Sequence, residues 1–447
     1  MYVSVLQQDF WVRGLALDMS QPHKRPAIAR WRARLRLHPL AKLGPGLITG
    51  VADDDPSGIA TYSQAGAQFG LDMLWTMPVA YPLMSAIQSM CGRLGRVTGK
   101  GLSANIKENF SPIVLKTIVL LLLIANTLNI AADVAAMGEV GEIVTGIGRH
   151  VMTLGFVIGT LLLQIFIPYH RYVFFLKWLT ISLLAYAAVL FTVHVPWGQV
   201  ISHTVWPRFT LNAAAATVIV GVFGTTISPY LFFWQASEEV EDMRGEPALL
   251  SDPERAVPEL KRISRDTWSG MLYSNMASYF IILATALTLH ASGITQINTA
   301  GEAATALRPL AGDFAFLLFA LGILGVGLIG VPVLAGSAGY AMSEAMGWKW
   351  GLERTANDAR GFYGVITVSV LAALAIQYSP ISPMRALFWS AVINGLVAVP
   401  LMVVLILLVS RTKVMGAFTA SKPIIILGWM TVALMAAAGV AMFLPGI

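Results

Sequence analysis

The sequence predicts an all-α integral membrane protein in which two groups of five spanning helices are followed by an eleventh helix. Three observations predict this fold: the composition, a series of apolar runs, and two proline-interrupted runs at matching positions. Of the 447 residues, 56% are hydrophobic and only 12% are charged. Most of the chain therefore cannot face water and belongs in lipid.

Apolar runs of about 20 residues, each long enough to cross a hydrocarbon core of about 30 Å, recur from residue 46 to the C-terminus. The expected spans are 46–70, 73–95, 113–137, 151–169, 172–194, 213–242, 268–291, 313–343, 361–378, 385–410 and 423–445. We assign residues 43–447 to one transporter domain. Within it, the first repeat covers about 46–194, the second about 213–410, and an accessory helix about 423–445.

The distribution of basic residues predicts how the chain is oriented. With the N-terminus in the cytoplasm, only four of the 30 Lys and Arg residues fall in outer loops: Arg149, Arg208, Arg308 and Arg385. Basic residues are retained on the cytoplasmic side of membranes. We therefore expect a multi-pass protein of the plasma (inner) membrane with a cytoplasmic N-terminus and an extracytoplasmic C-terminus.

Residues 1–42 form a basic arm before the first span, without the basic-then-apolar run of a cleaved signal peptide. Its cations include Lys24, Arg25, Arg30, Arg32, Arg34 and Arg36. A basic stretch beside a span is typical of binding to anionic lipid headgroups, and nucleic-acid binding is the alternative reading of the same charge. We expect membrane lipids as partners, no nucleic acid, and a monomer as the simplest assembly.

Spans 1 and 6 are predicted to be broken helices. Span 1 carries Asp-Asp-Asp-Pro-Ser-Gly at 53–58, and span 6 carries Gly-Thr-Thr-Ile-Ser-Pro at 224–229. Proline removes a backbone donor and clashes with the preceding turn, and irregular backbone at membrane depth is tolerated only where it lines an enclosed or watery cavity. Breaks in corresponding spans of two repeats predict a central ion site. The alternative is that Pro56 and Pro229 only kink their helices.

Three consecutive acids precede the first of these prolines. A carboxylate at mid-bilayer costs about 2.5 to 3.5 kcal/mol on insertion scales, and no Lys or Arg lies in the middle of any expected span. An incoming cation would neutralise Asp55, which adjoins the proline. For Asp53 and Asp54, the alternative is that they face water in a vestibule.

Two further polar residues lie deep in expected spans. Asp133 in span 3 follows Asn126 and Asn129 on roughly the same helix face, and it is either a residue of the ion pathway or a structural acid bonded to hydroxyls. Asn394 in span 10 is either a source of a ligand oxygen or a partner in an interhelical hydrogen bond.

Several functional classes lack their required residues. The seven histidines all fall in tails or at span ends, and Cys91 is the only cysteine, which excludes an internal disulfide and a thiolate metal cluster. The sequence contains no zinc-protease, nucleophile-elbow or phosphate-loop motif. We therefore expect no enzyme activity and no cofactor, and transport driven by an ion gradient.

Several segments resemble the Nramp divalent-metal transporters. The first two spans carry the clearest likeness, at residues 44–46, 55–59, 64–67 and 95–100, and weaker likeness extends through 132–135, the broken span 6 and residues 336–347. The resemblance implies a LeuT-like architecture of inverted five-helix repeats.

The chain departs from the family pattern at residues that bear on function. The family's Asp-Pro-Gly-Asn has its aspartate here as Asp55, but Gly58 replaces the asparagine. Ser228 and Tyr230 stand where the family's Met-Pro-His has methionine and histidine, and Ala136 replaces a glutamate of the family's proton route. These substitutions resemble the Nramp-related magnesium transporter branch, in which transport is thought to be uncoupled from protons.

The resemblance and the residues together predict uptake of partly hydrated Mg²⁺, with Mn²⁺ also accepted, because an all-oxygen site favours hard ions. The expected metal ligands are Asp55, Thr225 and Ser228. Water-mediated contacts are expected from Asp54, Ser57, Gly58, Tyr230 and Asn394, and Asp53 and Asp133 are expected along the pathway. The alternatives are a proton-coupled Mn²⁺/Fe²⁺ symporter, with Asp133 as the relay, and a Na⁺-coupled organic-solute symporter.

Overall fold

The computed structural model describes residues 49–444 except 51, 168–181, 209–211, 244 and 377–381. These residues belong to one compact unit, Gly44–Ile447, and within the described ranges every regular element is a helix. The basic arm at 1–42 lies outside the described residues.

The observed helices overlap the expected spans wherever the chain is described, although α13 starts 12 residues before the expected 268 and α6 ends eight residues after the expected 137. The long or paired helices are α3 (Pro56–Phe69), α4 (Thr76–Thr98), α6 (Pro112–Thr145), α7 (Arg149–Phe166), α11 (Ala213–Thr226), α12 (Pro229–Glu241), α13 (Ala256–Thr288), α16 (Ala315–Met346), α17 (Arg360–Ile376), α18 (Pro383–Ser410) and α20 (Lys422–Ala441). By length and hydropathy, seven segments of the described chain qualify as membrane spans. Of the fifth expected span, 172–194, residues 172–181 lie outside the described residues, and the described part contains α9 (Leu184–Val189).

Shorter helices connect the spans. They are η2 (Gly70–Met73), α5 (Leu102–Asn109), α10 (Trp197–Val205), η4 (Pro253–Arg255), η5 (His290–Ser292), α14 (Ala300–Ala304), η6 (Thr305–Leu307), α15 (Arg308–Ala311), η7 (Gly312–Phe314) and α19 (Thr412–Met415).

Both predicted breaks are present. Residues 49, 50, 52 and 53 are helical, the chain leaves the helix at Asp54 and Asp55, and α3 then starts at Pro56. In span 6, α11 ends at Thr226, the next two residues are not helical, and α12 starts at Pro229. Each proline occupies the first turn of a new helix, where its missing N–H costs no hydrogen bond. The prolines therefore begin half-helices, and the reading that they only kink continuous helices is wrong.

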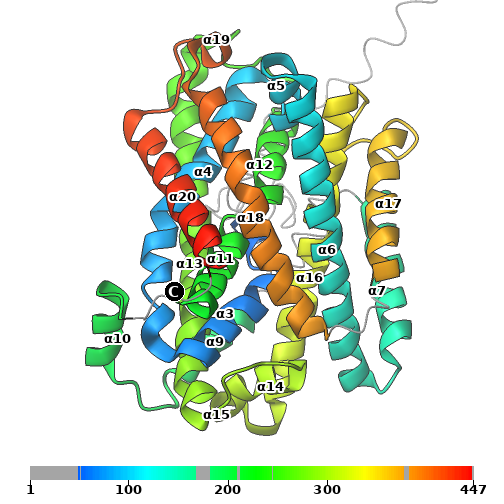
Figure 1. The fold of residues 1–447 in the computed structure, drawn as a ribbon. Coiled ribbons are helices and arrows are strands. Elements are labelled where there is room, and N and C mark those ends of the chain that lie inside the picture. Colours follow the sequence, from blue (N-terminus) through cyan, green and yellow to red (C-terminus); the bar gives the residue numbers. More distant parts are fainter. Residues whose placement is uncertain are drawn as a thin grey trace, which may run out of the picture. The chain divides into compact units, whose positions relative to one another are not determined.

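Close backbone contacts hold the second break against span 10. A Cβ atom built on Gly224 would lie 2.1 Å from the Ala391 carbonyl oxygen and 2.5 Å from the Gly395 nitrogen. Only glycine allows α11 to approach α18 this closely. Figure 1 shows α18 in orange next to the red α20, which also packs against it. The break in α11 and α12 is therefore fixed between packed helices.

A buried carboxylate joins three helices at the end of α12 away from the break. Glu344 of α16 accepts hydrogen bonds from the Ser237 hydroxyl (2.8 Å) and from the Ala104 backbone N–H in the first turn of α5 (3.2 Å). A Cβ atom on Gly101 would overlap this carboxylate. Glycine at position 101 therefore lets Glu344 cap α5 and bind α12 at the same time.

Candidate ion site

Asp55 is the N-cap of α3, and four donors surround its carboxylate. Its Oδ1 accepts from the Ser57 hydroxyl (2.6 Å) and the Gly58 N–H (2.8 Å), as an N-cap aspartate does, and its Oδ2 accepts from the Asn129 amide (2.9 Å) and the Tyr230 hydroxyl (3.4 Å). Only 1% of the Asp55 surface is exposed. This expected anchor lies at the centre of a network that joins spans 1, 3 and 6.

The second break supplies hydroxyl and carbonyl oxygens beside Asp55. The Thr225 hydroxyl lies 3.5 Å from that of Ser57, which connects the two breaks. The Ser228 hydroxyl donates to the Thr225 carbonyl (2.6 Å) and lies 3.1 Å from the Gly224 carbonyl. Thr225 is an expected metal ligand, and its carbonyl oxygen already accepts this hydrogen bond from Ser228. One lone pair of the Thr225 carbonyl oxygen therefore remains for another partner.

Gly58 and Tyr230 lie on either side of the space between the two breaks. A Cβ atom on Gly58 would lie 3.3 Å from the Thr225 hydroxyl and 3.3 Å from the Tyr62 ring. Tyr230 is fully buried, and its hydroxyl lies 3.1 Å from the Ala52 carbonyl as well as near Asp55. A larger residue at position 58 would therefore fill space beside Thr225.

Asp53 and Asp54 face span 7. The Ser274 hydroxyl lies 2.7 Å from Asp53 Oδ2 and 3.0 Å from Asp54 Oδ1, and the Ser278 hydroxyl lies 3.4 Å from the same Asp54 oxygen. Asp53 Oδ1 and Asp54 Oδ2 are buried without a hydrogen-bond partner. Since both residues are at most 1% exposed, the alternative that they face water in a vestibule is wrong for this structure.

Asp133 and Asn129 lie on one face of α6, but only Asn129 reaches Asp55. Asn129 donates to Asp55 and accepts from the Ser390 hydroxyl of α18 (2.7 Å). Asp133 is fully buried, and neither of its carboxylate oxygens has a hydrogen-bond partner. The reading of Asp133 as a structural acid bonded to hydroxyls is therefore wrong for this structure.

Among the described residues, Asn126 donates hydrogen bonds to another helix, whereas Asn394 makes none. Asn126 donates to the Leu334 carbonyl (2.9 Å) and the Ser337 hydroxyl (2.7 Å) of α16. Asn394 is fully buried on α18, beside the residues that contact Gly224, and neither its amide nitrogen nor its oxygen has a partner. Asn394 therefore makes no interhelical hydrogen bond within the part of the chain that the structure describes.

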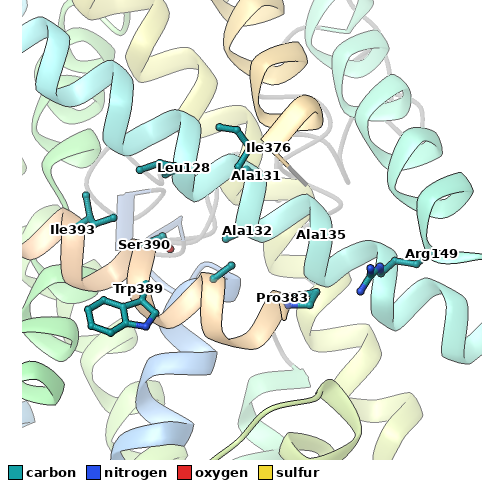
Figure 2. A pocket seen from close by; sticks show the side chains of 11 residues that line it. Leu128, Ala131, Ala132, Ala135, Arg149, Ile376, Pro383, Trp389, Ser390 and Ile393 are labelled. Atoms are coloured by element: carbon teal, nitrogen blue, oxygen red, sulfur yellow. The ribbon is translucent and has the colours of Figure 1, made fainter. Parts of the chain in front are cut away.

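A cavity of about 150 Å³ lies between α6, α17 and α18. Figure 2 shows Ser390 of α18 near the alanines of α6, with Arg149 at one end of the cavity. Ser390 donates to Asn129, which in turn donates to Asp55. Two side chains therefore separate this mostly apolar cavity from the Asp55 carboxylate.

The groups gathered at the two breaks are all oxygens or amides. Within the described ranges, no three His, Cys, Asp or Glu side chains are placed to hold a metal ion together. His203 pairs with Asp72 (2.7 Å) and His290 lies against the Ala67 carbonyl (2.8 Å), both away from the breaks.

Sequence reasoning missed the two serines of α13 and the direct role of Asn129. The i, i+4 spacing of Ser274 and Ser278 was a weak signal for a shared face. Asn129 was recognised as sharing a face with Asp133, but its contact with Asp55 was not foreseen.

Two half-helices that meet at mid-membrane in spans 1 and 6 define the class of secondary transporters built from inverted repeats. Solved structures show the same fold. The chain is similar to the manganese transporter of Eremococcus coleocola in complex with an aromatic bis-isothiourea compound (TM-score 0.71, 16% identity, 95% of this chain and 88% of that one). It is also similar to Mhp1, a nucleobase-cation-symport-1 transporter (TM-score 0.52, 13% identity, 90% and 92%).

The chain belongs to the Nramp family. The family described as natural resistance-associated macrophage protein-like matches residues 46–445. Two relatives carry the name divalent metal cation transporter MntH. The one from Acidiphilium cryptum is 27% identical over 94% of each chain, and the one from Verminephrobacter eiseniae is 30% identical over 80% of this chain and 82% of its own.

Proposed function

We propose that this chain is a divalent metal cation carrier that takes up Mg²⁺ by alternating access, also accepts Mn²⁺, and does not couple transport to protons. The observation that carries the choice of Mg²⁺ is the oxygen-only set around Asp55, with a serine and a tyrosine where a thioether and an imidazole would favour softer metals. The membrane potential supplies about 4.6 kcal/mol per 100 mV for two charges.

Asp55 is the anchoring carboxylate in this proposal, and the Thr225 carbonyl and Ser228 hydroxyl are the other ligands. An ion that binds Asp55 Oδ2 must replace one of its present donors. The Tyr230 hydroxyl, at 3.4 Å, is the longest of the four contacts and therefore the easiest to displace. Tyr230 would then act as a wall or gate of the site, because its contact with Asp55 would be present without an ion and lost when an ion binds.

Water-mediated contacts fit the remaining residues. Mg²⁺ loses its water reluctantly, and glycine at position 58 places no side chain in the narrow space beside Thr225. Asn394, which is buried with free donor and acceptor atoms, suits a contact with an ion-bound water. Asp54 would contact the hydrated ion through water, and Asp53 and Asp133 would line its route.

A second candidate is a proton-coupled Mn²⁺ symporter. The observation that favours it is Asp133, a fully buried carboxylate with no hydrogen-bond partner, which is available to carry a proton. Against it, Ala136 and Tyr230 cannot pass a proton on at physiological pH. A Na⁺-coupled organic-solute symporter is disfavoured, because the buried acids of span 1 would repel a solute carboxylate.

We further propose that the protein lies in the plasma membrane with its N-terminus in the cytoplasm and its C-terminus outside. The distribution of basic residues supports this orientation. The basic arm at 1–42 would then contact anionic lipid headgroups.

Uptake of Mg²⁺ and of Mn²⁺ into proteoliposomes that contain an internal pH dye tests the proposal. We expect Mg²⁺ uptake without acidification in the wild type, its loss in Asp55→Ala, and no effect of Asp313→Ala, which removes an exposed carboxylate outside the site. Uptake of Mn²⁺ alone with proton entry would overturn the proposal in favour of the symporter.

A further inference from the structure

Asp53 and Asp54 have too few donors for two buried carboxylates. Their four oxygens offer about eight acceptor positions. Ser274 and Ser278 each carry one hydroxyl proton, and Ser278 also lies 2.9 Å from the Ser274 carbonyl. Among the described residues these two hydroxyls supply at most two protons, and one oxygen of each carboxylate has no hydrogen-bond partner there.

Among the described residues, no ion pair includes Asp53 or Asp54. The charged groups acting on them are other acids of the same helix break. Bases elsewhere in the described chain pair with other acids, as in the contact of Arg262 with Glu239 (2.6 Å). An uncompensated pair of buried charges is strongly unfavourable, so each carboxylate must either take up a proton or bind a cation.

Charge balance leaves a place for a second cation. Asp53, Asp54, Asp55 and Asp133 are all at most 1% exposed. When all four are ionised, one divalent ion at Asp55 offsets two negative charges and leaves two. A second divalent ion can offset these in place of two protons.

We propose that Asp53, Asp54, Ser274 and Ser278 form a second divalent-cation site, separate from the one at Asp55. Its ligands are two carboxylate oxygens and the serine hydroxyl oxygens, completed by water. This is the hard, oxygen-only set that Mg²⁺ and Mn²⁺ accept. The inference rests on the proposed function for the class of ion. It assigns a binding site to residues that the proposed function places only along the route of the ion.

The two sites lie on opposite sides of the break in span 1. Asp55 caps α3, whereas Asp53 belongs to the preceding half-helix and faces α13. With a cytoplasmic N-terminus, the second site lies on the release side. An ion leaving Asp55 would pass to a pair of carboxylates of which each has one oxygen without a hydrogen-bond partner among the described residues.

Equilibrium titration of the purified full chain with Mn²⁺, followed by the electron paramagnetic resonance signal of free Mn²⁺, tests the inference. We expect two bound Mn²⁺ per chain in the wild type, one in Asp53→Asn/Asp54→Asn, and one in Asp55→Asn. Ser274→Ala/Ser278→Ala keeps both charges and should weaken one site about tenfold. Ser269→Ala is the matched control, because its hydroxyl on the same helix lies 3.0 Å from the Asp266 carbonyl and away from the acids.

Several results would overturn the second site. They are an unchanged stoichiometry in Asp53→Asn/Asp54→Asn, a single wild-type Mn²⁺ that Asp55→Asn abolishes, and no binding at millimolar Mn²⁺. If the double asparagine variant does not fold, unchanged affinities in Ser274→Ala/Ser278→Ala decide against the site. A single Mn²⁺ that is lost in Asp53→Asn/Asp54→Asn but kept in Asp55→Asn would support the second site and overturn the proposed role of Asp55.

Discussion

Asp55 and its neighbours Asp53 and Asp54 are equally buried but differently surrounded. Asp55 accepts from three close donors of spans 1 and 3, and the Tyr230 hydroxyl of span 6 is shared between Asp55 and the Ala52 carbonyl. Within the described chain, Asp53 and Asp54 share only two serine hydroxyls. A carboxylate with complete hydrogen bonding is stable without a ligand, but an incompletely bonded one is not. The comparison indicates that Asp55 is pre-organised by the fold, while the stability of Asp53 and Asp54 depends on what binds them.

The largest effect should come from removing the pre-organised carboxylate. Asp55→Ala should reduce Mg²⁺ uptake at least a hundredfold, because it removes the anchoring charge, and should also cost about 1 kcal/mol of stability through the lost N-cap. Proteoliposome uptake and thermal unfolding of the same preparations measure the two effects. Retained uptake in this variant would show that Asp55 serves only to cap α3.

The next effect concerns ion choice at Asp55. Gly58→Asn/Ser228→Met restores the amide and thioether of the ordinary family pattern, and it should lower Mg²⁺ uptake relative to Mn²⁺ about tenfold, or about 1.4 kcal/mol. Competition of Mg²⁺ with Mn²⁺ uptake measures the ratio. Gln68→Asn, at a partly exposed position of the same half-helix, serves as the control. An unchanged ratio in Gly58→Asn/Ser228→Met would contradict the proposal that the oxygen ligands determine selectivity.

Removal of divalent ions should affect Asp53 and Asp54 more than Asp55. Chelation should lower the melting temperature of the wild type, since an ion at a hundred times its Kd stabilises by about 2.7 kcal/mol. Asp53→Asn/Asp54→Asn should show a smaller decrease, because it lacks the charges that need the ion. Differential scanning fluorimetry with and without a chelator measures both, and an equal decrease in the two proteins would contradict the contrast drawn above.

The smallest effect should come from Asn129→Ala, which removes one of the four donors to Asp55. We expect a loss of about 1 kcal/mol, or roughly a fivefold weaker apparent affinity for Mg²⁺. Concentration dependence of uptake measures it. Thr127→Ala on the same helix, whose hydroxyl donates to the Leu123 carbonyl, should leave the affinity unchanged.

The fold was predictable because its signals are local. Apolar runs determine the spans, and a proline beside polar residues marks each break, so Pro56 and Pro229 were sufficient to place the half-helices. The contacts of the site were less predictable. Serines and threonines within spans commonly bond to their own helix carbonyls, as Thr285 and Thr288 do, so the sequence of α13 did not distinguish Ser274 as a partner of the acids. The spacing of Asn129 and Asp133 predicted a shared face but not which of the two reaches Asp55.

The bond between Ser237 and Glu344 has a consequence for how the carrier opens. It ties the far end of α12 to α16 and α5, so a tilt of α12 away from α16 must first release it. Such a hydrogen bond contributes about 0.5 to 3 kcal/mol, depending on whether Glu344 is ionised, which is less than the roughly 4.6 kcal/mol that 100 mV supplies to a divalent ion. The bond between Ser237 and Glu344 would thus hold α12 in place when no ion is bound. The energy that the membrane potential supplies to a divalent ion would be enough to break it.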